Sequence, residues 1–445
     1  MKLRHLNHCL SALLPFLLLP LAAAAQDAPE PERWNAKFQA TYIWQTKPGF
    51  GAAYSGVNSL SPLAEKSYSF TSTAYLGLRL ARDTELYFNP ELVQGVAMSN
   101  LTGLGGLPNG ELQKTAGPNP TLYRARLFVR QTWNMGGEGG EREAVASDAN
   151  QLAGWRSKDR VVLTAGNLAV TDIFDSNAYA NDPRTQFMNW SFLTHGAYDF
   201  AADSRGYSMG AALEYYTGDW AFRFGRFMQP KESNGLALDR SLLKHYGDQY
   251  ELEKGYTLAG RQGAVKLLYF RNRAIMGGFS DAIANAAGGV PDIATVRKLR
   301  VKQGWGVNLE QSLGDNVGMF ARLGRSDGES ETYAFAEIDQ SLSMGVSVKG
   351  SGWGRAQDTL GLAYARNGLS ASHQAFLAAG GSGFFIGDGR LNYRPETILE
   401  GYYSLALDFL KNSAISFGMQ YIRNPAYNAD RGPVKVMSVR LHTEF

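Results

Sequence analysis

Residues 34–45 read WNAKFQATYIWQ, and this stretch decides the fold. Every second residue from Trp34 to Trp44 is apolar, and the residues between them are polar except for Ile43. In a β-strand a period of two puts the apolar side chains on one face, whereas a helix would scatter them around its circumference. The stretch therefore predicts a strand with one apolar face and one polar face.

The same alternation returns along the chain, for example in residues 68–80, 299–310, 415–421 and 434–445. Repeated amphipathic strands of about ten residues are typical of a transmembrane β-barrel. Closure of the barrel pairs every strand edge, which lipid requires because it offers no partner to backbone N–H and C=O groups. A soluble β-sandwich also alternates, but its strands are usually shorter and its apolar faces point inward. We therefore predict an all-β, antiparallel transmembrane barrel.

The barrel is expected to have about sixteen strands, because bacterial barrels have an even number. The expected strand starts lie near Trp34, Tyr68, Leu86, Leu122, Val161, Tyr207, Trp220, Tyr250, Val265, Leu299, Val317, Tyr333, Leu360, Ile398, Ile415 and Val434. Long and short connections alternate, and the long ones are 47–66, 97–120, 167–205, 229–247, 272–296 and 367–389. Short turns are periplasmic and long loops external in such barrels, so both termini are expected in the periplasm. The segment Met135–Lys158 is long where a short turn is due, and its role is left unassigned.

The N-terminus predicts export. Lys2 and Arg4 precede a leucine-rich core at 10–21 and four alanines at 22–25, which is the layout of a cleaved secretory signal. The core is too short to act as a membrane-spanning anchor. The expected division is a signal peptide at 1–25, a short periplasmic segment at 26–33 and the barrel domain at 34–445. Together with the strands, this predicts the outer membrane of a Gram-negative bacterium.

Composition narrows the function. The chain has 44 basic and 41 acidic residues, and removal of the signal leaves 44 − 2 = 42 basic ones, so nothing favours a nucleic-acid partner. The single cysteine, Cys9, lies inside the signal, which leaves no thiol for a disulfide or a cysteine metal site. No cofactor and no metal are expected.

The last strand carries its own signal. Residues 437–445 alternate and end on Phe445, an arrangement that resembles the mark by which outer-membrane proteins are recognised for insertion. We therefore predict that Phe445 serves assembly through the barrel-assembly machinery.

Charged residues on the predicted inward faces suggest a pore. On the strand that starts near Leu122, the alternation predicts that Arg124, Arg126 and Arg130 face inward. Later strands are expected to add Arg300, Lys302, Arg322, Glu337, Asp339, Glu396 and Glu400. Burial of so many charges in a packed core would be prohibitive, whereas a water-filled channel solvates them. A plugged barrel, or charges paired only to stiffen the wall, stays open as the alternative.

A long loop follows Asn167, and residues 171–190 of it read TDIFDSNAYANDPRTQFMNW. Such a loop is expected to fold into the lumen and narrow it. Its polar groups beside aromatic faces suit sugars, although Asp, Asn and Pro also simply make turns. The candidate contacts are Asp172, Asp175, Asn177, Asp182, Arg184, Asn189 and Trp190.

Four runs, at 123–133 (YRARLFVRQTW), 172–190, 333–339 (YAFAEID) and 395–403 (PETILEGYY), resemble the carbohydrate-selective porins of the OprB type. The resemblance extends over nearly the whole mature chain. It implies a sixteen-stranded barrel for passive uptake of glucose and other sugars through an arginine-lined constriction. Carried over here, it implies that the arginines at 124, 126 and 130 line the wall and that the 172–190 loop forms the constriction.

Two other functions are alternatives to sugar transport. The arginine row would also suit a porin for another small solute, such as an organic anion. A barrel-type hydrolase needs a histidine beside a nucleophile, and the mature chain has only four histidines, none in a recognisable catalytic motif. No catalytic residue is therefore expected, and the chain is not predicted to be an enzyme. The expected partners are sugars and outer-membrane lipid, and the choice between monomer and homo-oligomer stays open.

Overall fold

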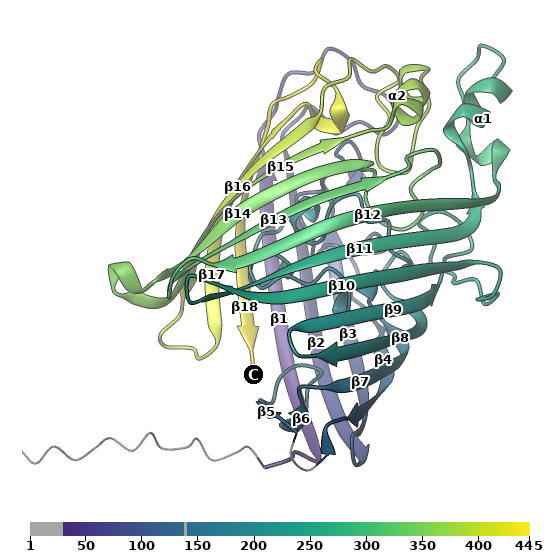
Figure 1. Cartoon of the computed structure of the whole chain (residues 1–445). Coiled ribbons are helices and arrows are strands. Elements are labelled where there is room, and N and C mark those ends of the chain that lie inside the picture. Colours follow the sequence, from purple (N-terminus) through teal and green to yellow (C-terminus); the bar gives the residue numbers. More distant parts are fainter. Residues whose placement is uncertain (1–29, 138–139) are drawn as a thin grey trace, which may run out of the picture.

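The computed structural model describes residues 30–137 and 140–445. Sixteen antiparallel strands form one closed barrel, in which β1 pairs with β18 to complete the ring (Figure 1). The predicted fold class and strand number are confirmed. The predicted signal peptide at 1–25 lies outside the described residues. In the described part of the chain, no helix is long and apolar enough to cross a membrane.

The barrel strands are β1 (Trp34–Lys47), β2 (Glu65–Ala81), β3 (Thr84–Val96), β4 (Thr121–Asn134), β7 (Arg160–Leu168), β8 (Ser208–Thr217), β9 (Trp220–Met228), β10 (Tyr246–Leu258), β11 (Arg261–Met276), β12 (Lys298–Ser312), β13 (Val317–Ser326), β14 (Gln340–Gly350), β15 (Arg355–Gly368), β16 (Glu396–Ala406), β17 (Ser413–Arg423) and β18 (Val434–Glu444). A separate hairpin consists of β5 (Arg142–Val145) and β6 (Gly154–Ser157). Two short helices, α1 (Phe279–Asn285) and α2 (Ala371–Ala378), lie in long loops.

One predicted strand start is wrong. Residues 333–339 alternate like a strand but form a loop, and β14 begins only at Gln340. The reason is a competing hydrogen-bond acceptor: the carboxylate of Asp199 takes the backbone N–H groups of residues 333, 334 and 335 at 2.8–3.0 Å. A side chain that satisfies three consecutive amides removes the need for a neighbouring strand.

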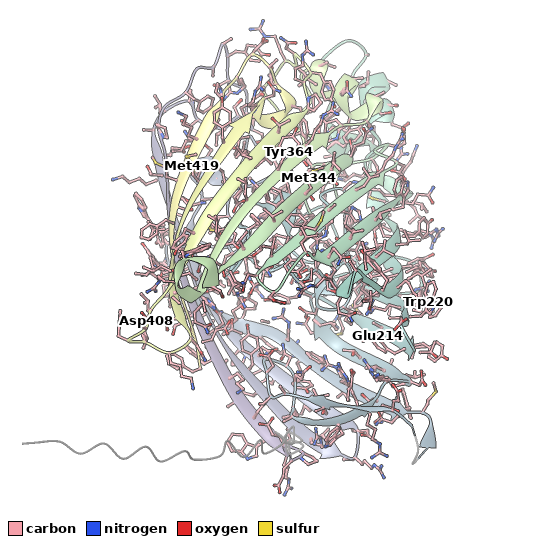
Figure 2. The ribbon with its side chains drawn as sticks, turned by 60° about the vertical axis from the view of Figure 1, so that its left-hand side comes forward. Glu214, Trp220, Met344, Tyr364, Asp408 and Met419 are labelled. Atoms are coloured by element: carbon pink, nitrogen blue, oxygen red, sulfur yellow. The ribbon has the colours of Figure 1, made fainter. Side chains whose placement is uncertain are left out.

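The outer face of the barrel is apolar, as the alternation predicts. Figure 2 labels Met344, Tyr364 and Met419, which come from β14, β15 and β17 and are 44, 37 and 54% exposed. On neighbouring strands aromatic rings stack in pairs, for example Tyr215 with Phe222 at 6.1 Å. An apolar outer face of this kind is typical of barrels that span a membrane.

The two ends of the barrel differ. The short turns, the C-terminus and the β5–β6 hairpin lie at one end, and α1 and α2 lie at the other (Figure 1). This matches the predicted alternation of short and long connections. We refer to the two ends as the turn end and the loop end.

The lumen is less open than predicted, because long loops fold into it and pack there. The ring of Phe187, in the loop between β7 and β8, lies 5.4 Å from that of Phe192. It also lies 5.6 Å from the ring of Phe320 on β13 and 5.1 Å from that of Tyr402 on β16. Each of these four aromatic residues is at most 4% exposed. Part of the barrel interior is therefore a hydrophobic core, and solutes are confined to what remains.

Candidate functional site

Strand β4 carries the three predicted wall arginines, but a bulge splits them. The register between β3 and β4 shifts at Ala125, so the inward and outward positions exchange there. On the loop-end side of Ala125, Tyr123 lies opposite the buried Glu91 and donates a hydrogen bond of 2.5 Å to its carboxylate. Because neighbours alternate, Arg124 points to the outer face and is exposed, whereas Arg126 points into the lumen. The predicted inward orientation is wrong for Arg124.

The loop 169–207 enters the lumen, as predicted, and Arg322 on β13 anchors it. Arg322 donates to Asp175 from Nε (3.4 Å) and to two backbone carbonyls of the loop from Nη1 (2.7 and 2.9 Å). Asn177 donates to Asn308 on β12 at 2.7 Å. Arg322, Asp175 and Asn177 are at most 5% exposed. They attach the loop to the wall, and the prediction that they line the pore is wrong.

Four predicted pore carboxylates also attach loops. Glu396 accepts from two amides of the loop 97–120 and Glu400 from two amides of the loop 169–207, each pair at 2.7 and 3.0 Å. Glu337 and Asp339 lie in the loop before β14 and accept from amides of residues 385, 386 and 370 at 2.7–2.9 Å. None of the four is more than 1% exposed, so their prediction as solute contacts is wrong. Loop amides that enter the barrel have no strand partner, and an inward carboxylate provides one.

Arg300 on β12 lies near the loop end and bonds with Asp281 of α1. It therefore holds the outer loop that carries α1. Lys302, two residues further along β12, forms an ion pair with Asp199 at 3.0 Å and is 1% exposed. Neither side chain lines either of the two cavities described next.

Two of the cavities in the remaining lumen are separated by one ion pair. A cavity of about 440 Å³ on the loop-end side is lined by Arg126, and one of about 700 Å³ on the turn-end side is lined by Arg130. Asp172 lines both. Its carboxylate accepts from Nε and Nη2 of Arg126, both at 2.7 Å, in a bidentate pair. The side chains of Arg126 and Asp172 keep 13 and 30% exposure, so the constriction remains accessible.

The loop-end cavity has a polar wall around Arg184. This side chain donates to Glu111 at 2.7 Å, to the hydroxyl of Tyr75 at 2.7 Å and to Glu91 at 3.2 Å. Burial raises the pKa of Glu111, although Arg184 opposes the shift. The planar guanidinium is therefore fixed among acceptors at the edge of the constriction.

The opposite wall is aromatic. Trp190 stacks on Phe335 with 5.1 Å between ring centroids and 7° between planes, and Phe200 lies 4.8 Å from the same phenylalanine. The ammonium of Lys114 lies 5.8 Å from the Trp190 ring. Burial lowers the pKa of this lysine to about 7. The cavity thus combines an apolar face with charged hydrogen-bonding groups.

Of the predicted contacts, Arg126, Asp172, Arg184 and Trp190 line the loop-end cavity, although Trp190 is only 5% exposed, and other residues of this site were not predicted. Glu91 could have been predicted, because the alternation along β3 places it on the same inward face as Tyr87, Asn89 and Val93. Glu111 and Lys114 could not, because they lie in the loop 97–120, where no periodicity indicates direction.

Comparison with known proteins agrees with this architecture. Residues 58–445 match the family described as "Carbohydrate-selective porin, OprB family". Among solved structures, the chain is similar to Pseudomonas putida OprB at high pH (16% identity, TM-score 0.68, covering 93% of this chain and 94% of that chain). It is also similar to Acinetobacter baumannii OccAB1 (9% identity, TM-score 0.50, covering 93 and 97%). No curated protein sequence matches the chain.

Proposed function

Because the chain belongs to the carbohydrate-selective porin family of the OprB type, we propose that it is an outer-membrane channel for passive, selective diffusion of glucose and other sugars. The observation that carries the proposal is the exposed Arg126–Asp172 pair between two cavities, beside the aromatic wall of Trp190. Sugars present hydroxyl groups at their rim and C–H groups on their faces. A guanidinium and a carboxylate match the rim, and the mostly buried aromatic residues that line the loop-end cavity offer apolar surface to the face.

Weak binding suits this role. A pore must bind its solute well enough to admit it and weakly enough to release it. Asp172 occupies the Nε and Nη2 edge of Arg126 and neutralises the charge of its guanidinium. A sugar hydroxyl that contacts Arg126 therefore contacts a paired charge. The contact is therefore weaker than with an unpaired arginine, which favours passage over retention.

We further propose that residues 1–25 are removed on export, that 26–33 remain in the periplasm, and that 34–445 form the barrel. Both termini of the described barrel lie at the turn end, which supports this orientation. The lipid contact of the outer face and insertion by the assembly machinery belong to the same proposal.

The test compares Arg126→Ala with Arg124→Ala. Both remove one arginine from β4, but only Arg126 faces the lumen. We expect Arg126→Ala to weaken glucose block of single-channel current by about fivefold, as for the loss of one ordinary hydrogen bond of about 1 kcal/mol. Glucose entry into proteoliposomes should slow, while Arg124→Ala behaves like wild type. Unchanged glucose block in correctly folded Arg126→Ala would refute the role of the constriction.

A further inference from the structure

Residues 140–158, which belong to the segment that the sequence leaves unexplained, fold back into the turn end of the barrel. Residues 147–153 of this segment, which we term the strap, bond to inward side chains of the four strands β1, β2, β3 and β4. Gln151 accepts from Asn35 on β1 at 2.8 Å, and the N–H of Leu152 donates to the hydroxyl of Tyr87 on β3 at 3.2 Å. Leu152 is 2% exposed. The strap is therefore built into the mouth of the barrel and forms part of the wall of the turn-end cavity.

The strap also orients Arg130. The carbonyl of Asn150 accepts from Nη1 of Arg130 at 2.9 Å, and the guanidinium lies over the rings of Tyr87 and Phe128 at 5.2 and 5.4 Å. Three contacts thus fix one planar donor group without using its Nε and Nη2 atoms. Among the residues that the structure describes, these two atoms have no hydrogen-bond partner, and they are not buried.

Arg126, four residues earlier on the same strand, shows which kind of group the Nε and Nη2 edge of an arginine binds. There, Nε and Nη2 hold the carboxylate of Asp172 in two parallel bonds of 2.7 Å. Arg130 presents the same pair of donors to the larger cavity. A carboxylate is the group that matches this fork in geometry and in charge.

The turn-end cavity is lined by six arginines and five carboxylates, so its overall charge is nearly balanced and an anion is favoured only at Arg130 itself. Arg156 and Arg160, which line the same cavity, pair with Glu143 at 2.6 and 3.3 Å. Within residues 30–137 and 140–445, no carboxylate forms an ion pair with Arg130. Trp155, also in the lining and 42% exposed, offers an aromatic surface to a sugar ring.

We propose that Arg130, held in place by the strap, is a second solute site on the periplasmic side of the constriction, which binds the carboxylate of sugar acids such as aldonates and uronates. The proposal rests on the proposed sugar-porin function and adds a preference among its solutes. The Arg126–Asp172 pair admits sugars, and Arg130 retains those that carry a carboxylate.

The test measures block of single-channel current by gluconate and by glucose, each added to either side of the bilayer. For the wild type we expect gluconate to block at about tenfold lower concentration than glucose from the turn-end side, because two charge-assisted bonds form. Arg130→Gln should abolish this difference, because the gluconate concentration needed for block rises to that of glucose. The matched control is Arg142→Gln, which removes one exposed arginine from the same cavity and should keep the difference.

Three results would overturn the proposal: equal block by gluconate and glucose in the wild type, a gluconate preference that survives Arg130→Gln, or an equal loss in both variants. The last would mean that overall cavity charge acts without a site. Replacement of residues 142–157 by a short turn should also abolish the preference, and its survival would refute the role of the strap. Failure of glucose to block the wild type would refute the sugar-porin function itself. Gluconate block could still be compared between the wild type and Arg130→Gln.

Discussion

Replacement of Gly324 by alanine should dislodge the loop that narrows the pore. Gly306 on β12 and Gly324 on β13 face each other in the sheet and form a recess in the barrel wall. The ring of His195, from the loop 169–207, fills this recess and is 1% exposed. It stacks on Tyr198 at 5.2 Å and lies 6.5 Å from Phe270, so it cannot swing aside within its own pocket.

The size of the conflict follows from the geometry. A Cβ atom on Gly324 would lie 2.1 Å from Nδ1 of His195 and 2.7 Å from Cγ. Such atoms rest at roughly 3.5 Å, so the loop must retreat by about 1.4 Å or the strands must part. Overpacking of this kind costs about 1–3 kcal/mol. Because the same loop carries Asp172, the constriction and its conductance should change together with the stability.

The assay is urea unfolding in micelles, followed by fluorescence of the 8 tryptophans, with conductance recorded in parallel. Gly314→Ala is the control, because its Cβ would meet nothing within 4 Å. In a His195→Ala background the added methyl group should cost less than about 0.5 kcal/mol, since the clash is gone. If Gly324→Ala unfolds like wild type, or stays destabilising without the histidine ring, the recess does not hold the loop.

Three other predictions follow from the sequence and the structure. Mass spectrometry of the outer-membrane form should find a chain that starts near Gln26, and retention of residues 1–25 would contradict the signal assignment. Deletion of Phe445, whose N–H and C=O bond to Phe38 of β1 at 2.9 and 3.0 Å, should lower the yield of heat-modifiable barrel without changing sugar flux per folded channel. Because burial lowers the pKa of Lys114 to about 7, this lysine should be mostly neutral at about pH 8.5 and charged at about pH 5.5. Reversal potentials in a KCl gradient should therefore shift toward anion selectivity as the pH falls, more in wild type than in Lys114→Met, and equal shifts would exclude the lysine as the cause.

The strands could be predicted because the membrane imposes a period of two along each of them. Apart from residues 333–339, each predicted start lies no more than five residues from the observed one. The alternation of inward and outward residues fails where a strand contains one extra residue. On β4 it reverses at Ala125, so Arg124 faces outward and Tyr123 inward. The sequence of β4 does not mark that position, but Pro90 does so on the neighbouring strand: it lies opposite Arg124 and cannot donate to the ladder, which is typical of a bulge.

The loops could not be predicted because their hydrogen-bond partners lie far away in the sequence. Asp199 bonds to the amides of residues 333–335 across more than 130 positions, and Glu396 bonds to those of 105 and 106 across about 290. A carboxylate on an inward face looks identical in the sequence whether it meets water, a solute or a loop amide. Only the folded chain separates these cases.

The same consideration explains why so few charges remain for transport. A buried ion pair must be fully matched, because an unpaired charge in a packed interior is costly. Arg322 and Asp175 meet this condition with side chains that are 0 and 1% exposed, and they are fixed. Arg126 and Asp172 keep 13 and 30% exposure, so water or a sugar hydroxyl can replace part of their contact at small cost. The buried charges therefore anchor loops, and the solute contacts that we propose involve the charged groups that water still reaches.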